Sequence, residues 1–248
     1  MRLLIDAGNT RIKWALAEPD NVIGHWYSSG HATHAETEKL KHVWSDQTIH
    51  RVVISNVAGE EVASQLRKIL DECDVSTDAI HFFHAQRECA GVHNRYAQPT
   101  QLGSDRFASL VGARHRFFGE RLLVITCGTA TTIDALDTDG TFLGGMILPG
   151  LATMATSLAV NTALLPTVHA TDRARVFADN TQDAIISGCL SAQIGAIVYA
   201  YSQQSDPVPR CVLSGGAAHY VAPYLPMKFD AVDNLVLLGL DAFIAGVS

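Results

Sequence analysis

The sequence contains little charge and no cluster of positive charge. Charged residues make up 17% of its 248 positions, the formal net charge is −7 at pH 7, and the lysines and arginines are scattered. Surfaces that bind nucleic acid or anionic lipid are usually basic, so neither nucleic acid nor a membrane is expected as a partner. The apolar content of 48% predicts a folded chain, long enough for one large domain or two small ones.

Cysteine pairs and the common nucleotide-binding and zinc-protease motifs are also missing. The five cysteines occur singly, without a CxxC pair, which predicts reduced thiols in a cytoplasmic protein and no zinc site. Neither GxxxxGK[ST], nor GxGxxG after a strand, nor HExxH is present, so a P-loop, a dinucleotide-binding fold and this class of zinc protease are not expected. The short apolar run at the N-terminus, with a single arginine, does not predict a signal peptide.

Two long stretches lack charged residues, 140–171 and 184–205. The second has the length of a membrane span, but it carries several polar side chains, including Gln193. Its bulkiest apolar residues recur at helical spacing, at Ile186, Leu190, Ile194, Ile197 and Tyr201. We therefore expect a helix that is buried between domains or subunits rather than one that crosses a membrane.

An internal repeat indicates a duplicated domain. It consists of LIDAGNTRIKWAL at 4–16 and VITCGTATTIDAL at 124–136, aligned at a constant offset of 120 residues. Gly8 then matches Gly128, and both copies have the pattern of a strand, a glycine turn and a second strand. Because the offset is about half the chain, we predict an α/β fold of two similar domains, 1–118 and 119–248, with a cleft between them.

Hydrophobic periodicity predicts a similar order of elements in the two halves. In the first half we expect strands at 20–29, 51–57 and 79–85, helices at 35–44, 59–72 and 104–118, and a loop over 85–101. In the second half we expect strands at 121–127, 130–137, 142–148 and 210–215, a turn at 138–141, a helix opened by Pro149-Gly150, a loop over 161–180, a helix at 182–203 and a closing helix from Asn234.

The glycine turns are candidate phosphate-binding segments. The turn at 6–10, with the sequence DAGNT, can present backbone N–H groups to a phosphate, and Asp6 at the strand end could hold Mg²⁺ through water. A plain hairpin with Asp and Asn as turn formers explains the same residues. The equivalent turn at Gly128-Thr129 favours the phosphate site, because two such turns across a cleft would cradle a polyphosphate. Gly144-Gly145 and Ser214-Gly215-Gly216 offer two further flexible turns.

The segment QLGSDRFASLVGAR carries a second candidate carboxylate. Gly103 or Ser104 would cap the predicted helix and place Asp105 in its first turn. Asp105 followed by Arg106 is compatible with a helix cap that has a surface partner. It is also compatible with a general base beside a cation, as phosphoryl transfer to a hydroxyl requires.

Five motifs in order resemble type III pantothenate kinase, the family that includes the Bvg accessory factor. They are DAGNTRIKWAL, GSDR, CGTATTIDAL, GGMILPG and LSGG, and they span nearly the whole chain. The resemblance implies an actin-like, sugar-kinase-like ATPase with two ribonuclease-H-like domains, acting as a homodimer. The implied reaction is ATP-dependent phosphorylation of the 4′-hydroxyl of pantothenate, the first step of coenzyme A biosynthesis, with Mg²⁺.

The resemblance also implies roles for individual residues. Asp105 would be the catalytic base and Arg106 a pantothenate contact. The pantothenate pocket would further contain Tyr96, Gly103 and Ser104, together with Thr181 of the partner subunit. The ATP phosphates and Mg²⁺ would be bound by Asp6, Ala7, Gly8, Asn9, Thr10, Arg11 and Lys13, with Thr129 opposite and with Gly215 and Gly216 near the adenosine.

One position departs from the family pattern. The family usually has Asp-x-Gly-Thr where this chain has Thr126-Cys127-Gly128-Thr129, and that aspartate is linked with a monovalent cation, K⁺ or NH₄⁺. A neutral threonine hydroxyl is a much weaker cation ligand than a carboxylate. We therefore predict that the monovalent-cation site is weakened, absent or relocated.

Two other functions stay open at this point. One is a kinase of the same superfamily that acts on a different alcohol, which substrate profiling would separate. The other is a non-catalytic, nucleotide-binding regulatory protein. The presence of both Asp6 and Asp105 argues against the second, since a protein without catalysis has no need of either carboxylate.

Overall fold

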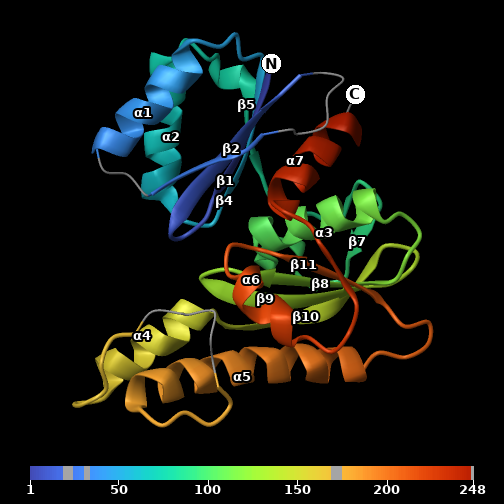
Figure 1. Ribbon diagram of the computed structural model, residues 1–248. Helices are drawn as coiled ribbons and strands as arrows, with labels where there is room; N and C mark the ends of the chain where they lie inside the picture. Colours follow the sequence, from blue (N-terminus) through green and yellow to red (C-terminus); the bar gives the residue numbers. More distant parts are fainter. Residues whose placement is uncertain (19–24, 31–33, 169–174, 247–248) are drawn as a thin grey trace. The chain divides into compact units, whose positions relative to one another are not determined.

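The computed structural model describes residues 1–18, 25–30, 34–168 and 175–246. The chain forms two compact units (Figure 1). Unit 1 comprises Met1–Arg116 together with Leu235–Ser248, and unit 2 comprises Phe117–Asn234. The observed boundary lies near the predicted one at 118, but the C-terminal segment, predicted in the second domain, belongs to unit 1.

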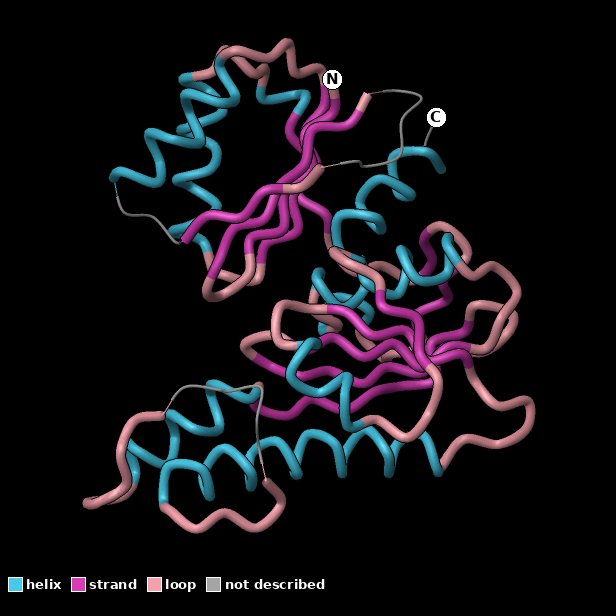
Figure 2. The backbone as a smooth tube through the Cα atoms, in the orientation of Figure 1, coloured by secondary structure: helices cyan, strands magenta, loops and turns pink. Residues whose placement is uncertain are grey.

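Unit 1 is built on a sheet with the strand order β3-β2-β1-β4-β5 (Figure 2). Strand β1 pairs antiparallel with β2 and parallel with β4, and β4 pairs parallel with β5. The central strands β1 and β4 are buried on both faces, which explains their unbroken apolar runs. The bounds are β1 Arg2–Ala7, β2 Arg11–Ala17, β3 Tyr27–Gly30, β4 Arg51–Asn56 and β5 Ile80–Phe83.

Helices pack on the sheet of unit 1. Helices α1 (His34–Ser45) and α2 (Glu60–Glu72) pack against each other, and their apolar residues share a core with Leu3 and Ile5 of β1. Helices α3 (Ser104–Arg116) and α7 (Leu235–Gly246) contact β4 as well as each other. Since successive residues of a strand point to opposite faces, the two helix pairs bury the two faces of β1 and β4.

Close contact between α3 and α7 explains why the C-terminal helix belongs to unit 1. A β-carbon at Gly239 would collide with the carbonyl oxygen of Ala108, and one at Gly112 would collide with that of Leu235. The two backbones therefore meet where only glycine fits. The ring of Phe243 on α7 also packs edge-on against Phe83, with centroids 5.2 Å apart. Sequence order placed this helix in the second domain, whereas its packing places it in the first.

Unit 2 repeats the arrangement of unit 1. Its strands lie in the order β12-β11-β8-β9-β10, with β8 antiparallel to β9, β9 antiparallel to β10, and β8, β11 and β12 mutually parallel where they pair. This is the order of unit 1 with β8 in the place of β1, so the predicted duplication is visible in the topology. The bounds are β8 Leu122–Cys127, β9 Ala130–Leu136, β10 Thr141–Pro149, β11 Arg210–Ser214 and β12 Phe229–Ala231.

The two copies differ in the length of the first turn. Gly8 N–H donates to the carbonyl of Arg11, whereas Gly128 N–H donates to that of Ala130, one residue nearer. Ile5 consequently pairs with Trp14, but Ile125 pairs with Ile133. The constant offset of 120 holds up to the turn and becomes 119 after it, so the predicted alignment of 4–16 with 124–136 is wrong by one residue beyond the turn.

Helix α5 (Thr181–Ser202) is the long, uncharged helix expected from the sequence. It passes the length and hydropathy test for a membrane span, with 44% of the tested window buried. Ile186, Leu190 and Ile197 are buried in the core of unit 2, and Ile194 and Tyr201 pack against that core. This packing agrees with the predicted buried helix. Helix α5 covers the sheet of unit 2 together with α4 (Leu151–Asn161).

Several local predictions need correction. The predicted loop over 85–101 contains a small hairpin, β6 (Glu88–Cys89) and β7 (Val92–Asn94), and a 3-10 turn at Pro99–Gln101. Strands this short leave no alternating pattern in the sequence. Gly144-Gly145 is not a turn but lies within β10, at a bulge. Pro149 ends β10 and Gly150 caps α4. The first part of the predicted strand at 20–29 lies outside the described residues.

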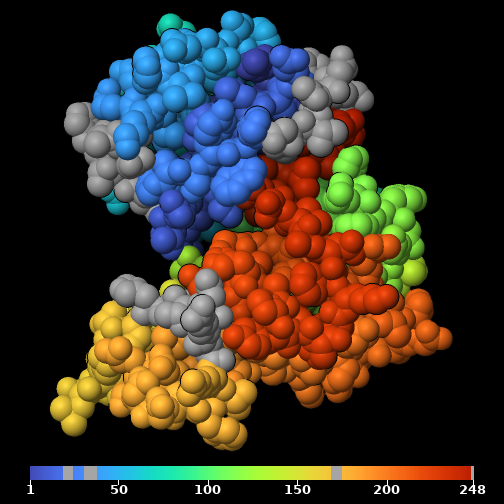
Figure 3. Space-filling model, in the orientation of Figure 1, coloured from blue at the N-terminus to red at the C-terminus, as the bar shows by residue number. Residues whose placement is uncertain are grey.

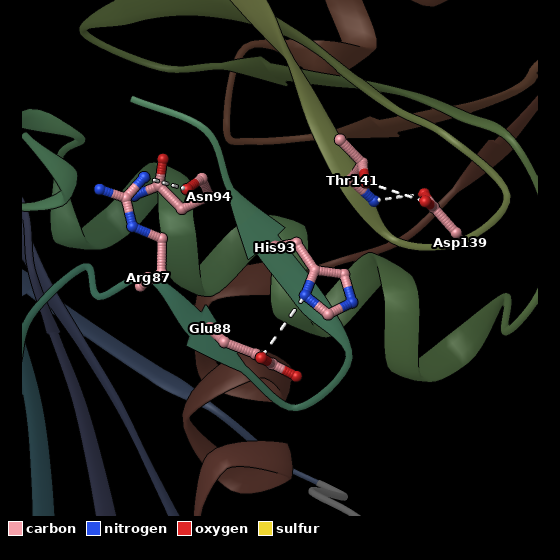
Figure 4. Close-up of polar contacts among 6 residues, drawn as sticks. All are labelled: Arg87, Glu88, His93, Asn94, Asp139 and Thr141. Atoms are coloured by element: carbon pink, nitrogen blue, oxygen red, sulfur yellow. Dashed lines mark hydrogen bonds and ion pairs between the residues drawn. The ribbon is translucent and has the colours of Figure 1, made fainter. Parts of the chain in front are cut away.

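The remaining short elements are also outside the prediction. They are the 3-10 turns at Thr77–Ala79 and Ala222–Tyr224, the helical turn α6 (Ala218–Val221) and the strand β12 named above. The predicted hairpin turn at 138–141 is confirmed. Asp139 accepts hydrogen bonds from both the backbone N–H and the hydroxyl of Thr141, at 2.8 and 3.0 Å (Figure 4).

Candidate active site

Asp6 is a buried carboxylate at the end of a central strand. Its side chain sits on β1, directly opposite Lys13 on β2 and beside Ser55 on β4, and the residue is 8% exposed. Burial raises the pKa of Asp6 to about 6; the positive charge of Lys13 lowers it, and the negative charge of Asp105 raises it. The two carboxylates predicted to serve catalysis therefore lie close enough to influence each other within unit 1.

The turn after Asp6 is accessible. Ala7 is buried in the strand and Gly8 is half-buried, while Asn9, Thr10 and Arg11 are exposed. The N–H of Gly8 closes the turn on the carbonyl of Arg11 at 3.1 Å. The polar side chains of the turn are thus exposed to solvent, at the same end of β1 as Asp6.

Asp105 lies in the first turn of α3, as predicted. Its Oδ1 accepts a hydrogen bond from the backbone N–H of Arg106 at 2.8 Å. Burial raises the pKa of Asp105, although that hydrogen bond and the charge of Arg106 lower it. Gly103 precedes the helix, and its carbonyl accepts from the N–H of Phe107. A β-carbon at position 103 would lie only 2.7 Å from Oδ1 of Asp105, so glycine leaves room for the carboxylate.

A buried pair of hydroxyls connects the helix that carries Asp105 to β4, the strand beside Asp6. Ser55 Oγ on β4 lies 2.9 Å from Ser104 Oγ at the start of α3. Ser55 is fully buried and is the sheet neighbour of Asp6, while Ser104 precedes Asp105 in the chain. This hydrogen bond fixes the start of α3 against the strand that flanks Asp6. The sequence contains no signal for Ser55, because its partner is 49 residues away.

Tyr96 and Arg106, both predicted to contact pantothenate, lie close together. The Nη1 atom of Arg106 lies 3.5 Å from the phenolic oxygen of Tyr96, and Arg106 is 7% exposed. Arg106 follows Asp105 directly, so a half-buried phenol, a buried guanidinium and a carboxylate share one side of unit 1. Such a set can bind a polar, anionic small molecule beside a base.

In unit 2, the predicted phosphate turns lie side by side. The carbonyl of Thr129 accepts from Gly150 N–H at 2.9 Å and from the Thr153 hydroxyl at 2.7 Å, which ties the turn to the start of α4. Gly215 has φ +98°, and a β-carbon there would collide with the backbone of Cys127. Gly216 next to it is exposed. The turns after β8 and β11 therefore meet at the carboxyl ends of two parallel strands, where α/β folds bind ligands.

Thr126 occupies the position in unit 2 that Asp6 occupies in unit 1. It pairs with Thr132 on β9 and with Ser214 on β11. Its Oγ1 is buried and has no hydrogen-bond partner within the described residues. The three side chains at this point are neutral hydroxyls, so a monovalent cation would find no carboxylate among them.

Thr181 lies at a different place in unit 2. It is the first residue of α5, exposed, and follows Asn180, whose side chain caps the helix by accepting from Asp183 N–H at 3.0 Å. It lines a cavity of about 560 Å³ between α4 and α5 together with apolar residues such as Leu158 and Ile185. Within unit 2 it is not part of the group formed by Thr129 and Gly215.

The described part of the chain holds no group of three or more His, Cys, Asp or Glu side chains that could ligate a metal by itself. A cation at Asp6 would have to complete its coordination with water and with ligand oxygens. Mg²⁺ is normally bound in that way, through one or two carboxylates, several waters and substrate phosphates.

Comparison with known proteins identifies relatives along the whole chain. A family model for type III pantothenate kinase matches residues 2–203. The type III pantothenate kinase of Janthinobacterium sp. (strain Marseille) is 49% identical, and the alignment covers 97% of this chain and 96% of that protein. The enzyme of Herminiimonas arsenicoxydans has the same identity and coverage.

Solved structures agree on the fold. A protein from Campylobacter jejuni, named as a Baf family transcriptional activator, superposes with a TM-score of 0.60 at 18% identity, covering 99% of this chain and 98% of that one. The activator of 2-hydroxyisocaproyl-CoA dehydratase from Clostridium difficile, solved with bound ADPNP, superposes with a TM-score of 0.58 at 14% identity, covering 99% and 95%. The predicted α/β fold of the actin-like and sugar-kinase-like ATPases is thereby confirmed.

The burial of Asp6 predicts a stability that depends on pH. An aspartate in an unfolded chain titrates near 3.9, so a folded-state pKa of about 6 means that ionisation above pH 6 destabilises the fold. Asp6→Asn removes the charge, and in buffer with EDTA at pH 7.5 we expect its free energy of unfolding to exceed that of the wild type by about 1–2 kcal/mol. The difference should shrink as pH falls from 6 to 4, because the wild-type carboxyl then becomes neutral.

Urea unfolding at pH 7.5 and 4.5 measures this effect. Asp46→Asn, at an exposed position in the same unit, is the control, and it should show no comparable gain. A variant of Asp6 that is no more stable than the wild type at pH 7.5 would show that Lys13 fully compensates the burial of the carboxylate.

Proposed function

The chain belongs to the type III pantothenate kinase family, and from that premise we propose that Asp105 is the general base of its reaction. Members of the family phosphorylate pantothenate in coenzyme A biosynthesis, and the chain is a kinase that transfers a phosphoryl group to an alcohol. The observation that carries the proposal is the position of Asp105 at the start of α3, with a raised pKa, beside Arg106 and near Asp6.

The proposed step is a phosphoryl transfer to the 4′-hydroxyl of pantothenate. The hydroxyl oxygen forms a bond to the γ-phosphorus of ATP while the bond from that phosphorus to the bridging oxygen breaks, so that ADP leaves. The carboxylate of Asp105 accepts the proton of the hydroxyl. A base whose pKa is raised toward neutrality transfers protons more effectively than an exposed aspartate would. Arg106 and Tyr96 orient the substrate so that its hydroxyl faces the carboxylate.

ATP with a divalent metal is the phosphoryl donor in this family of folds, and we assign the metal contact to Asp6. A single buried carboxylate is enough for an ion that keeps most of its water, because waters and phosphate oxygens complete the coordination. When bound, Mg²⁺ neutralises charge on the phosphates during transfer. The chain's own residues Asn9, Thr10, Arg11 and Lys13 supply donors and positive charge for the phosphates, and Thr129, Gly215 and Gly216 supply a second set of contacts in unit 2.

A monovalent cation does not fit the residues present at Thr126. A carboxylate is missing from the residues that pair with it, and its hydroxyl is neutral and buried. No step of the reaction is therefore assigned to K⁺ or NH₄⁺.

We further propose that the protein is a cytoplasmic homodimer. Large apolar side chains are exposed on unit 2 in the segments that follow α4 and precede α5, with Leu164 at 93% and Phe177 at 91% exposure. The space-filling view shows the α4 region, in yellow, on the surface of unit 2 (Figure 3). Exposed apolar area of this kind marks an interface. Thr181 is one of the residues that line the cavity between α4 and α5, which supports a role in the pantothenate pocket of the other subunit.

Removing the charge of Asp105 tests its role as the base. Asp105→Asn keeps a polar residue in the first turn of α3, so folding should persist, but kcat should fall by about 100-fold or more. ADP release with saturating ATP, Mg²⁺ and pantothenate measures this rate. Gly103→Ala should also lower kcat, by about tenfold, because its methyl group would displace the carboxylate. Gly30→Ala, where a β-carbon meets nothing within 4 Å, is the control. A near-normal kcat in Asp105→Asn would remove Asp105 from the role of base.

Mixing two variants tests whether the dimer completes the pocket. Thr181→Ala should raise the pantothenate KM, and Asp105→Asn should be nearly inactive. In a mixed dimer, one site takes its intact Asp105 from the Thr181→Ala chain and its intact Thr181 from the Asp105→Asn chain. After subunit exchange, the activity of the mixture at low pantothenate should exceed the sum of the separate activities. A mixture that only equals that sum would show that Thr181 does not act across subunits.

Replacing K⁺ tests the assignment at Thr126. Because the position lacks a carboxylate, we expect the rate with K⁺ to differ by less than about twofold from the rate with a large organic cation at the same ionic strength. Thr126→Asp restores a carboxylate and should introduce a dependence on K⁺. A strict requirement for K⁺ in the wild type would contradict this prediction.

A further inference from the structure

The segment that carries Tyr96 is held by one arginine. Arg87 lies just before β6, and its guanidinium donates from Nη1 to the carbonyl oxygens of Asn94 at 3.1 Å and Tyr96 at 2.9 Å. Its Nη2 donates to the carbonyl of Ala97 at 3.3 Å. Figure 4 shows the guanidinium facing the backbone of Asn94. One planar cation thus spans three carbonyls of a short irregular segment.

Asn94 holds the same segment from the inside. It is 1% exposed, its Oδ1 accepts from Tyr96 N–H at 3.0 Å, and its Nδ2 donates to the carbonyl of Pro99 at 3.1 Å. Its own N–H donates to the carbonyl of Arg87 at 2.9 Å, across the base of the β6–β7 hairpin. Residues 95–98, between β7 and the 3-10 turn, have no regular ladder for their backbone groups, so these side chains take over that function.

The hairpin places Arg87 beside the segment. Cys89 pairs with Val92, and the two residues between them, Ala90 and Gly91, both have positive φ angles of 45° and 77°. Two such residues form the tight turn that returns the chain on itself. The turn therefore brings Arg87 back to residues seven to ten positions further along the chain.

We propose that Arg87 is a positioning residue for the pantothenate pocket, acting through the backbone of Tyr96. The phenolic oxygen of Tyr96 lies 3.5 Å from Nη1 of Arg106, the residue that follows the base. Movement of the segment would carry the phenol away from that guanidinium. Arg87 itself is an exposed residue, and its guanidinium is engaged with these backbone carbonyls. This inference rests on the proposed function, in which Tyr96 and Arg106 contact pantothenate.

The geometry requires arginine in particular. A guanidinium offers five N–H donors in a fixed plane, whereas the ammonium of lysine is a point charge on a flexible chain. Lysine at this position could bond one or two of the carbonyls but would not bridge all three. Glutamine would remove the charge and most of the donors. The series Arg, Lys, Gln therefore loosens the segment in steps without inserting bulk.

Steady-state kinetics of Arg87→Lys and Arg87→Gln test the proposal. We expect Arg87→Gln to raise the pantothenate KM about tenfold, Arg87→Lys to raise it less, and both to leave kcat and the ATP KM within about twofold. Arg95→Gln, which removes the same charge from an exposed residue of the same segment, is the matched control and should leave all three parameters unchanged. Melting temperatures of all variants establish that each is folded.

The variant Tyr96→Phe separates failure of this inference from failure of the proposed function. It removes only the hydroxyl and should raise the pantothenate KM, and the double variant Arg87→Gln/Tyr96→Phe should be less impaired than the product of the single effects. If Tyr96→Phe raises the KM while Arg87→Gln lowers only the melting temperature, Arg87 is merely structural and the inference is overturned. If Tyr96→Phe leaves the KM unchanged, the proposed pocket itself is wrong, and the role of Arg87 falls with it.

Discussion

The mutual influence of two carboxylates, Asp6 and Asp105, is the constraint on which the proposed active site in unit 1 depends. Both are desolvated, and the negative charge of Asp105 makes ionisation of Asp6 harder still. Lys13 on one side and Arg106 on the other counter the charge that results. The fold supports this arrangement by placing Asp6 on a central strand and Asp105 at the start of a helix, joined through Ser55 and Ser104. A cation held at Asp6, as proposed above, would offset this repulsion.

The two units contain two copies of this strand-end position, and only one of them carries a charge. In unit 1 it is Asp6 with Lys13 and Ser55, and in unit 2 it is Thr126 with Thr132 and Ser214. The serine is common to both. In the unit 2 copy, the turns at Thr129 and Gly215 are brought together by a glycine that no side chain could replace. The two copies thus differ in chemistry, with charged side chains at this position in unit 1 and neutral hydroxyls in unit 2.

Much of the fold follows from patterns within the sequence. The buried strands β1, β4, β8 and β11 are continuous apolar runs, and α5 is predicted by the spacing of Ile186, Leu190 and Ile197. The errors have specific causes. The turn of the second repeat is one residue shorter, and an alignment at a constant offset, which contains no gap, could not show this. The hairpin at β6 and β7 is too short for any periodicity. Helix α7 follows unit 2 in the chain, but its glycine contact with α3 places it in unit 1.

The sequence by itself determined the duplicated α/β fold, the family and the chemical candidates at Asp6, Asp105, Arg106 and Thr126, because these lie in short motifs whose spacing is fixed along the chain. Only the tertiary structure decided which residues support them. Ser55 is 49 residues from Ser104, and Arg87 reaches Tyr96 through backbone carbonyls, which every residue possesses and no sequence pattern marks. Chemistry that resides in side-chain type is therefore visible in a sequence, whereas positioning that depends on burial and backbone geometry becomes visible only after the chain has folded.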